Sequence, residues 1–453
     1  MNTTSSSIWH GTPVGIIRVE KELSLRLTHE PFIVDGHGFK RNEICSAPEL
    51  KKGIDSIKTV SVQQNKAQGF LISARMLPRR SRLIRGIAYF ISSFYGINSS
   101  LDKALDKAVG QIYILVKSVY MELMRSRKRI NVQKNLSSFK DFSKKPFIHS
   151  PFSDGDIVFT CGLDWDHGIL EKISTIKKQV DLNLVTVIYD LIPISHPEYI
   201  QNTRHVNRLL GHFTLVAKLS NLVLVNTETT ATEFRKLCTQ LDLVTPEIRI
   251  VPWGVGFDSS LEPKEVPALL PKVKDNGYLL AVGTLEIRKN YQIILNVIKL
   301  AREKNQIIPH FVFVGTPGWG THELQIQIEN DELLQKSITW YKSATDEQLI
   351  WLYQNCDALL SPSFGEGFGL PVAEAQFFGK KTYISDIAVY RELFPNSVFI
   401  SPNDPAAWLK AITEEVESNP SSISIPDWDG ASKVLRRTIE EFFGTDLNYL
   451  SKS

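Results

Sequence analysis

The sequence predicts an α/β protein with two Rossmann-like domains, each a doubly wound parallel sheet, facing a central cleft. Three observations predict this class. The chain has 453 residues, too long for one ordinary core and long enough for two domains of about 150–250 residues. Short apolar runs rich in β-branched residues alternate with longer helical patterns, as in parallel sheets covered by helices. This alternation occurs twice along the chain.

The expected strands are nearly all apolar, as strands buried on both faces of a parallel sheet are. They span 156–160, 183–190, 222–226 and 248–252 in the first series, and 278–283, 310–315, 358–362, 381–385 and 397–400 in the second. Helical patterns such as "YQIILNVIKLAREKN" lie between them. Ligands of such sheets bind outside the carboxyl ends of the strands.

The stretch "GVGFDSSLEPKEVPALLPKVKDNG" separates the two series and is rich in Pro, Lys and Gly, which indicates an interdomain linker. We expect an N-terminal domain over 1–265 and a C-terminal domain over 266–430. A C-terminal helix over 431–453 is expected to pack back toward the N-terminal domain. Residues of about 50–150 have a mostly helical pattern and are expected to form an insertion in the first domain.

The composition is that of a globular chain, with 43% hydrophobic and 22% charged residues. The four cysteines are far apart and show no metal or redox spacing, which favours reduced thiols in a reducing compartment. The start, "MNTTSSSIWHGTP", lacks a basic region followed by an apolar stretch, and no run of about 18 apolar residues occurs. We therefore expect no signal peptide, no transmembrane helix and a cytoplasmic location.

The net charge of +3 is unevenly distributed. Residues 66–134 contain 14 Lys or Arg against 3 Asp or Glu, a net +11. Their arginines are mixed with apolar residues, a pattern that suits an anionic membrane surface, so the chain is expected to be peripheral on the inner face of the cell membrane. An ordinary solvated helical face is the alternative. Nucleic acid is not expected as a partner, because no nucleic-acid motif accompanies the charge.

The stretch "GTLEIRKN" follows an expected strand that ends at Gly283 and precedes a helix expected to begin near Asn290. Arg288 and Lys289 therefore lie together on a short loop at the mouth of the cleft. Two adjacent cations beside a helix start suit a diphosphate. A solvated Arg-Lys pair is the alternative.

The stretch "SPSFGEGFGLPVAEA" combines three glycines with Glu366 and Glu374. The glycines allow close backbone approach, and Pro371 fits the first turn of a helix whose positive end points at the loop. The spacing is not the G-x-G-x-x-G of dinucleotide-binding loops, which disfavours NAD. Carboxylates accept hydrogen bonds from vicinal diols, so the stretch predicts a nucleotide-sugar; capping and solvation are the alternative roles.

These motifs resemble those of glycosyltransferase family 4. The form "EGFGLPVAEA" matches its Glu-x7-Glu motif, and "VGTLEIRKN", "VFVGTPGWG" and "YQNCDALLSPS" resemble other parts of its C-terminal domain. In the N-terminal half, "HGTPVGIIRVE", "IYDLIPISHPEYI" and "LVLVNTETTATEF" resemble bacterial polysaccharide members. The resemblance covers nearly the whole chain except roughly 40–150. It implies a GT-B fold and hexose transfer from a nucleotide-diphospho-sugar with retention of configuration, without a metal or other cofactor.

The resemblance also implies residue roles. Arg288 and Lys289 would hold the diphosphate and stabilise the departing charge, Glu374 would bind the ribose diol, and Glu366 would contact the transferred sugar. Further donor contacts would come from Gly283, from the amides of Gly367, Phe368, Gly369 and Leu370, and from the glycine loop at Thr12 to Ile16, especially Gly15.

The sequence departs from the family where many members have a histidine, because Tyr189 and Asp190 stand at the end of that strand. Asp190 is therefore a candidate for acting on the acceptor or the sugar, while Tyr189 is a candidate for packing only. His196 follows and is interpreted as structural. A second departure is the short start, in which only "SIW" precedes the glycine loop, so the first strand is weak or missing.

The resemblance implies a glycan or lipid-linked glycan acceptor in cell-surface polysaccharide synthesis (O-antigen, capsule or exopolysaccharide). The residues do not identify the base or sugar of the donor, and GDP-mannose is the favoured candidate. Three alternatives remain: a glycosidase, which also uses two carboxylates, a nucleotide-sugar epimerase on the same fold, and a catalytically silent GT-B assembly subunit at the membrane. The complete set of Arg288, Lys289, Glu366 and Glu374 disfavours the silent subunit.

Overall fold

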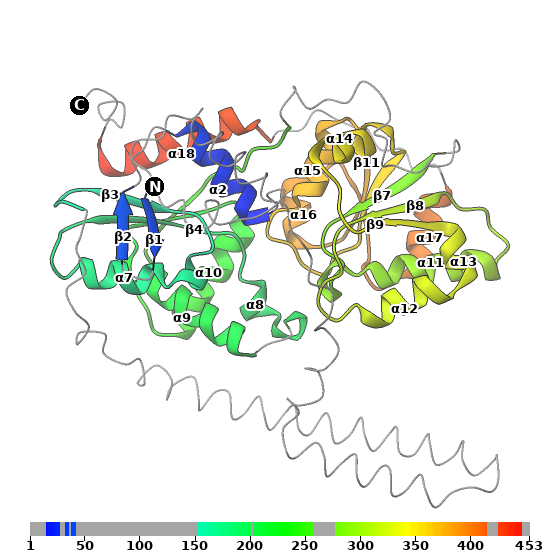
Figure 1. The fold of residues 1–453 in the computed structure, drawn as a ribbon, viewed down its shortest axis with the longest axis horizontal. Helices are drawn as coiled ribbons and strands as arrows, with labels where there is room; N and C mark the ends of the chain where they lie inside the picture. Colours follow the sequence, from blue (N-terminus) through cyan, green and yellow to red (C-terminus); the bar gives the residue numbers. More distant parts are fainter. Residues whose placement is uncertain are drawn as a thin grey trace, which may run out of the picture. The chain divides into compact units, whose positions relative to one another are not determined.

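The structure is a computed structural model that describes residues 15–27, 32–35, 38–41, 152–200, 203–257, 277–414 and 425–445 (Figure 1). The expected insertion at about 50–150, with the basic segment 66–134, lies outside the described residues. So does most of the expected linker.

The C-terminal domain is built on a six-stranded sheet in which every pair of neighbours is parallel. Its strands are β7 (Tyr278–Val282), β8 (His310–Val314), β9 (Ile338–Tyr341), β10 (Ala358–Ser361), β11 (Lys381–Ser385) and β12 (Val398–Ile400). Their order across the sheet is β12-β11-β10-β7-β8-β9. This is the doubly wound order, in which the strand order reverses between β7 and β10, and such sheets bind ligands at that point.

Helices cover both faces of this sheet, as the apolar strands predicted. They are η5 (Ile287–Lys289), α11 (Tyr291–Glu303), α12 (His322–Asn330), α13 (Glu332–Ser337), α14 (Asp346–Asn355), α15 (Leu370–Phe377), α16 (Ala388–Leu393) and α17 (Pro405–Thr413). Successive residues of β7 enter different cores: Leu279 joins the side chains of α11, α12, α13 and α17, whereas Leu280 joins those of α14, α15 and α16. The prediction of a doubly wound sheet is confirmed.

The N-terminal domain contains a four-stranded parallel sheet in the order β3-β4-β5-β6. Its strands are β3 (Ile157–Thr160), β4 (Asn183–Ile188), β5 (Leu222–Val225) and β6 (Glu247–Ile250). Its helices are α6 (Asp164–His167), α7 (Ile169–Ile176), α8 (Ile192–Ser195), η3 (Pro197–Tyr199), α9 (Thr203–Leu219) and α10 (Glu228–Gln240). Side chains of α7, α9 and α10 form one core with Val223 and Val225 of β5.

On the other face of the N-terminal sheet, a second core includes side chains from both ends of the described chain. Helix α2 (Gly15–Arg26) contributes Val19 and Leu23, and helix α18 (Trp428–Phe443) contributes Leu435 and Ile439. The two helices lie side by side (Figure 1). The Nε of Arg26 donates to Oδ1 of Asp429 at 2.5 Å. Packing against α2 thus places α18 beside the N-terminal domain.

Three local expectations differ from the structure. Strand β9, with the sequence "ITWY", was not predicted, because it is an edge strand in which only Ile338 is fully buried and it lacks a continuous apolar run. The run 248–252 was expected to be buried on both faces, but β6 is largely exposed and Ile250 is 47% exposed, since β6 is the last strand of the described sheet. An antiparallel pair, β1 (Phe32–Asp35) with β2 (Gly38–Arg41), was also not predicted.

Candidate functional site

Two loops meet at the carboxyl edge of the C-terminal sheet, where β7 and β10 are neighbours. The loop after β7 carries Arg288 and Lys289 in η5, and the loop after β10 carries Glu366. Arg288 Nη1 donates to Glu366 Oε2 at 2.9 Å, and Lys289 Nζ donates to Glu366 Oε1 at 2.6 Å. The N–H of Phe364 donates to the Arg288 carbonyl at 2.8 Å. Residues from two separate sequence motifs therefore form one cluster.

Charge fixes the geometry of this cluster. Glu366 is buried and also accepts from Ser363 Oγ at 2.7 Å. Burial raises the pKa of Glu366, but Lys289, Arg288 and the serine outweigh it and lower the pKa from 4.5 to about 2. Burial lowers the pKa of Arg288, but its carboxylate neighbours outweigh that and raise it. One of them, Glu286, accepts from Arg288 at 2.7 Å. Ion pairs with Glu366 thus hold both Arg288 and Lys289 in place.

The glycine loop leads directly into α15. Gly369 precedes the helix with φ of 90°, and a Cβ there would lie 2.6 Å from the Tyr390 ring, so glycine is required. Pro371 lies in the first turn, as predicted. The positive end of α15 points at the loop, although Pro371 has no N–H and the N–H groups of Val372 and Ala373 donate to the Gly369 carbonyl at 2.9 and 3.1 Å. Glu374 is the fifth residue of α15 and therefore lies in its second turn.

Glu374 has its own set of partners, none of which was predicted. Arg18 Nη1 of α2 donates to Glu374 Oε1 at 2.6 Å, and the Tyr353 hydroxyl donates to Oε2 at 2.7 Å. Arg18 also donates to the carbonyl of Gly256 at 2.8 Å and lies 4.6 Å from the centre of the Phe257 ring. Burial raises the pKa of Glu374, and Arg18 and Tyr353 offset only part of that rise. Both oxygens of the predicted ribose-binding carboxylate thus have protein partners.

The N-terminal domain contacts the same loop at Gly367. A Cβ at Gly367 would lie 2.5 Å from the Tyr189 carbonyl oxygen and 3.0 Å from Asp190 Cβ, both just after β4. Asn226, which follows β5, donates its side-chain N–H to the Gly367 carbonyl at 3.0 Å. Only a residue without a side chain allows this approach, so the middle glycine of the motif serves a contact between the domains.

Tyr189 and Asp190 point in different directions. The Tyr189 hydroxyl donates to the carbonyl of Cys161, and its ring centre lies 5.5 Å from that of Trp253, so this side chain packs in the core. Asp190 lies toward the cluster, where Oδ1 accepts from the N–H of Ile192 at 3.1 Å. Burial raises the pKa of Asp190, while Arg288 and that N–H oppose the rise.

The remaining predicted donor residues frame the site. Gly283 directly follows β7 with φ of 141°, and its carbonyl accepts from the Tyr291 hydroxyl at 3.0 Å. Gly15 is the first residue of α2, and most of the expected glycine loop before it lies outside the described residues. Phe368 and Leu370 flank Gly369 at the start of α15, and the Phe368 ring is buried in the core.

Sequence reasoning missed five residues that contact the predicted ones: Arg18, Asn226, Glu286, Tyr353 and Ser363. Two had a local signal, since Glu286 lies two positions before Arg288 and Ser363 lies three before Glu366. The others are brought in by tertiary contacts and had no such signal.

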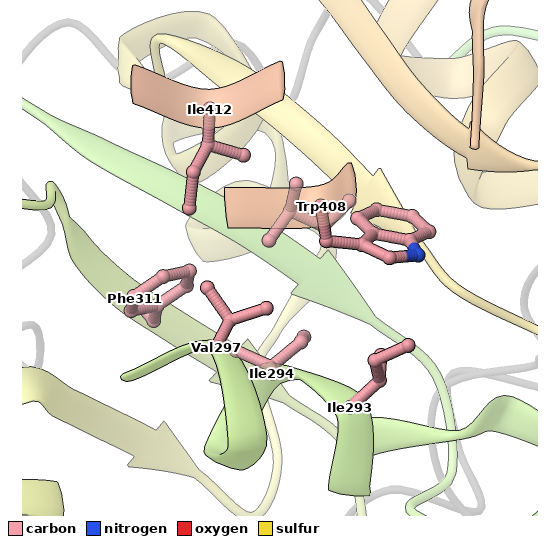
Figure 2. A pocket seen from close by; sticks show the side chains of 7 residues that line it. Ile293, Ile294, Val297, Phe311, Trp408 and Ile412 are labelled. Carbon is pink, nitrogen blue, oxygen red and sulfur yellow. The ribbon is translucent and has the colours of Figure 1, made fainter. Parts of the chain in front are cut away.

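A separate small pocket lies between α11, α17 and the C-terminal sheet (Figure 2). Its lining includes Ile293, Val297, Phe311 and Trp408. The indole N–H of Trp408 is already donated to the Ser401 carbonyl at 2.9 Å. The pocket therefore offers only hydrocarbon and is a gap in core packing, unlike the charged cluster.

Among the described residues, no group of three or more His, Cys, Asp or Glu side chains is arranged to hold a metal ion. In the same part of the chain, no helix combines the length and apolarity needed to cross a membrane.

Comparison with known sequences supports the interpretation of the C-terminal domain. Residues 264–424 match the family model of glycosyl transferases group 1. The serotype-specific mannosyltransferase WbdA of Escherichia coli is 28% identical over 199 residues, covering 41% of this chain and 24% of WbdA. The O-antigen chain mannosyltransferase RfbU of Salmonella typhimurium is 29% identical over 156 residues, covering 34% of this chain and 42% of RfbU. The chain thus matches less than half the length of either relative.

Comparison with solved structures supports the fold. A trehalose-6-phosphate synthase structure superposes with a TM-score of 0.50 and 15% identity, covering 65% of this chain and 75% of that one. Together with the two parallel sheets, this similarity agrees with the expected architecture. The chain has a GT-B fold, and its C-terminal domain is similar in sequence to the group 1 glycosyl transferases.

Proposed function

We propose that this protein is a glycosyltransferase that moves a hexose from a nucleotide-diphospho-sugar to a glycan or lipid-linked glycan of a cell-surface polysaccharide. The cluster of Arg288, Lys289 and Glu366 at the switch point beside the start of α15 carries this proposal. Fixed cations and a helix N-terminus suit a diphosphate leaving group. The mannosyltransferase names of the relatives favour GDP-mannose as the donor.

In this proposal Arg288 and Lys289 exchange part of their pairing with Glu366 for the donor diphosphate. The positive end of α15 adds to the diphosphate site. Glu374 accepts from the ribose hydroxyls, which requires Arg18 or Tyr353 to share an oxygen of Glu374. Glu366 is then free to accept from a hydroxyl of the transferred sugar. Asp190 lies beside Gly367, where it can contact the transferred sugar or the acceptor.

The reaction proceeds with retention of configuration. The acceptor oxygen forms a bond to the anomeric carbon on the face from which the diphosphate leaves, and the bond to the phosphate oxygen breaks. The acceptor proton passes to the leaving diphosphate, so the proposal needs neither a protein base nor a metal ion. Arg288 and Lys289 meet the growing negative charge, and loss of one such preorganised donor costs about 3–4 kcal/mol of transition-state stabilisation.

The proposal is tested first by thermal stabilisation against UDP, GDP, ADP, CMP and NAD. One nucleoside diphosphate is expected to raise the melting temperature, and Arg288→Ala and Glu374→Ala are expected to abolish the rise. Stabilisation by NAD alone, or by none of the nucleotides, contradicts the donor site. Turnover of the matching labelled nucleotide-sugars then separates a transferase from a silent subunit, which binds without turnover, and from an epimerase, which converts the sugar without transferring it.

The location on the membrane is a separate part of the proposal and rests on the sequence of 66–134. Sedimentation with anionic vesicles is expected, and neutralising Arg79, Arg80, Arg82 and Arg85 together is expected to abolish it. Unchanged sedimentation of that variant would contradict a basic docking segment.

A further inference from the structure

A hydrogen bond from the N-terminal domain holds the peptide that follows Glu366. Asn226 directly follows β5, and its Nδ2 donates to the Gly367 carbonyl at 3.0 Å, across 141 positions of the sequence. Gly367 also lies against the end of β4, the neighbour of β5, where a Cβ at Gly367 would lie 2.5 Å from the Tyr189 carbonyl oxygen. The loop is therefore held by two adjacent strands of the N-terminal sheet.

The contact with Gly367 determines which way the side-chain amide of Asn226 faces. The Gly367 carbonyl can only accept, so the NH₂ group of Asn226 must face it and Oδ1 points elsewhere. That Oδ1 is buried and has no hydrogen-bond partner within the described part of the chain. A buried acceptor without a donor is unfavourable. The bond to Gly367 is therefore kept although the oxygen of the same side chain is left without a donor.

Fixing the Gly367 carbonyl also fixes the direction of the next N–H. The described residues contain no cis peptide bond, so the N–H of Phe368 points away from the Gly367 carbonyl and from Asn226. Phe368 is buried, and its N–H donates to no other described residue. Buried backbone N–H groups nearly always have a partner, and an oxygen atom of a ligand would provide one here.

The N–H of Phe368 lies close in the chain to both parts of the candidate site. Glu366, which accepts from Arg288 and Lys289, is two residues before Phe368, and α15 begins two residues after it at Leu370. A backbone N–H beside fixed cations and the positive end of a helix suits an anionic ligand. Such a donor is most effective when its direction is already set before the ligand binds.

We propose that Asn226 is a positioning residue for sugar transfer. Its side-chain amide fixes the Gly367–Phe368 peptide, so that the Phe368 N–H faces an oxygen of the bound nucleotide-diphospho-sugar. The inference rests on the proposed function, because it concerns the donor side of the same site. An oriented N–H gains strength as negative charge grows on the leaving diphosphate, so kcat depends on Asn226 more than nucleotide binding does.

Hydrogen–deuterium exchange of the full chain without a ligand tests the positioning itself. Asn226→Ala is expected to speed exchange of the backbone amides of 364–370 about tenfold or more. Glu392→Ala is the matched control, because Glu392 of α16 accepts from the N–H groups of Glu228 and Thr229 and so makes another contact between the same domains. It is expected to leave exchange at 364–370 unchanged. Unchanged exchange in Asn226→Ala, or an equal increase in both variants, would overturn the proposal.

Turnover then tests the role of Asn226 in the reaction. Release of labelled sugar to water from GDP-mannose, UDP-glucose and ADP-glucose is measured, which needs no acceptor. Asn226→Ala is expected to lower kcat about tenfold or more, and the melting-temperature rise with the matching nucleoside diphosphate is expected to remain, which shows that the variant is folded. Asn226→Asp keeps the shape of the side chain but places a carboxylate oxygen against the Gly367 carbonyl, so it is expected to lower kcat at least as much.

The controls separate failure of this inference from failure of the proposed function. Glu392→Ala is expected to keep the wild-type kcat. A wild-type kcat in Asn226→Ala, or an equal fall in Asn226→Ala and Glu392→Ala, would overturn the role of Asn226 while leaving the donor site standing. If no nucleotide-sugar turns over in the wild-type chain, the proposed function fails, and the exchange experiment alone decides whether Asn226 fixes the loop.

Discussion

Arg18 and Glu374 form a 2.6 Å ion pair although 356 residues separate them in the sequence. The pair joins α2 to α15, and both side chains are largely buried, at 13% and 6% exposure. The carboxylate that the family motif assigns to the ribose is therefore also a contact between the two domains. If Glu374 binds the donor ribose as proposed, this pair couples donor binding to the position of α2.

We predict that Arg18→Met lowers the free energy of unfolding by about 3 kcal/mol, because it leaves the Glu374 carboxylate buried without its cation. Urea denaturation measures the change. Arg26→Met is the matched control on the same helix, since its partner Asp429 is 68% exposed. It is expected to cost less than about 1 kcal/mol. Equal losses in the two variants would show that the buried pair contributes no more than a surface pair.

The Glu366 carboxylate should contribute stability that depends on pH. Its pKa is lowered from 4.5 to about 2 in the folded chain, so the contribution is complete above about pH 4.5 and is lost as pH falls toward 2. Glu366→Gln is expected to cost about 3 kcal/mol at pH 7 and roughly half of that at pH 3. Denaturant unfolding of the wild-type chain and of Glu366→Gln at pH 7 and pH 3 measures this difference in unfolding free energy. A difference that is the same at both pH values would contradict the prediction.

A methyl group at Gly367 should disrupt the contact between the domains. The added Cβ would lie 2.5 Å from the Tyr189 carbonyl oxygen, which is backbone and cannot move aside cheaply. Gly367→Ala is expected to lower the unfolding free energy by about 1–3 kcal/mol and to reduce turnover. Gly365→Ala is the matched control, because its Cβ would meet only Ile192 atoms at 3.7–3.8 Å. Gly365→Ala is expected to have a higher melting temperature than Gly367→Ala in thermal unfolding. The reverse order would contradict the predicted clash at Gly367.

His212 should destabilise the N-terminal domain when protonated. Burial lowers its pKa from 6.5 to about 4, so the neutral ring is favoured in the fold. The destabilisation caused by burying His212 is absent above about pH 6.5 and grows as the pH falls toward 4. Between pH 7 and pH 5 the wild-type chain is expected to lose about 2 kcal/mol more than His212→Phe, which keeps an aromatic ring against Trp165. Parallel losses in both proteins would rule out this role of His212.

Local patterns predicted the site only where the relevant residues are close in sequence. Arg288 and Lys289 were found because they are adjacent, and Pro371 because its fixed φ suits a first helical turn. Glu286 and Ser363 lie within the same motifs but have no distinctive chemistry on their own. Strand β9 was missed because it lies at the edge of the sheet and only Ile338 is fully buried, so it lacks the continuous apolar run of a strand buried on both faces.

The sequence by itself determined the alternation of strands and helices, the glycine loop before α15, and the residue types of the charged cluster, because these depend on local periodicity and backbone conformation. The tertiary structure alone decided which of these residues meet. The order of the C-terminal sheet places β7 next to β10, and this brings Arg288 to Glu366 across 78 positions. Packing of the two domains against each other brings Arg18 to Glu374 and Tyr199 to Phe364. Such contacts depend on how buried surfaces fit together, and no short stretch of sequence encodes that fit.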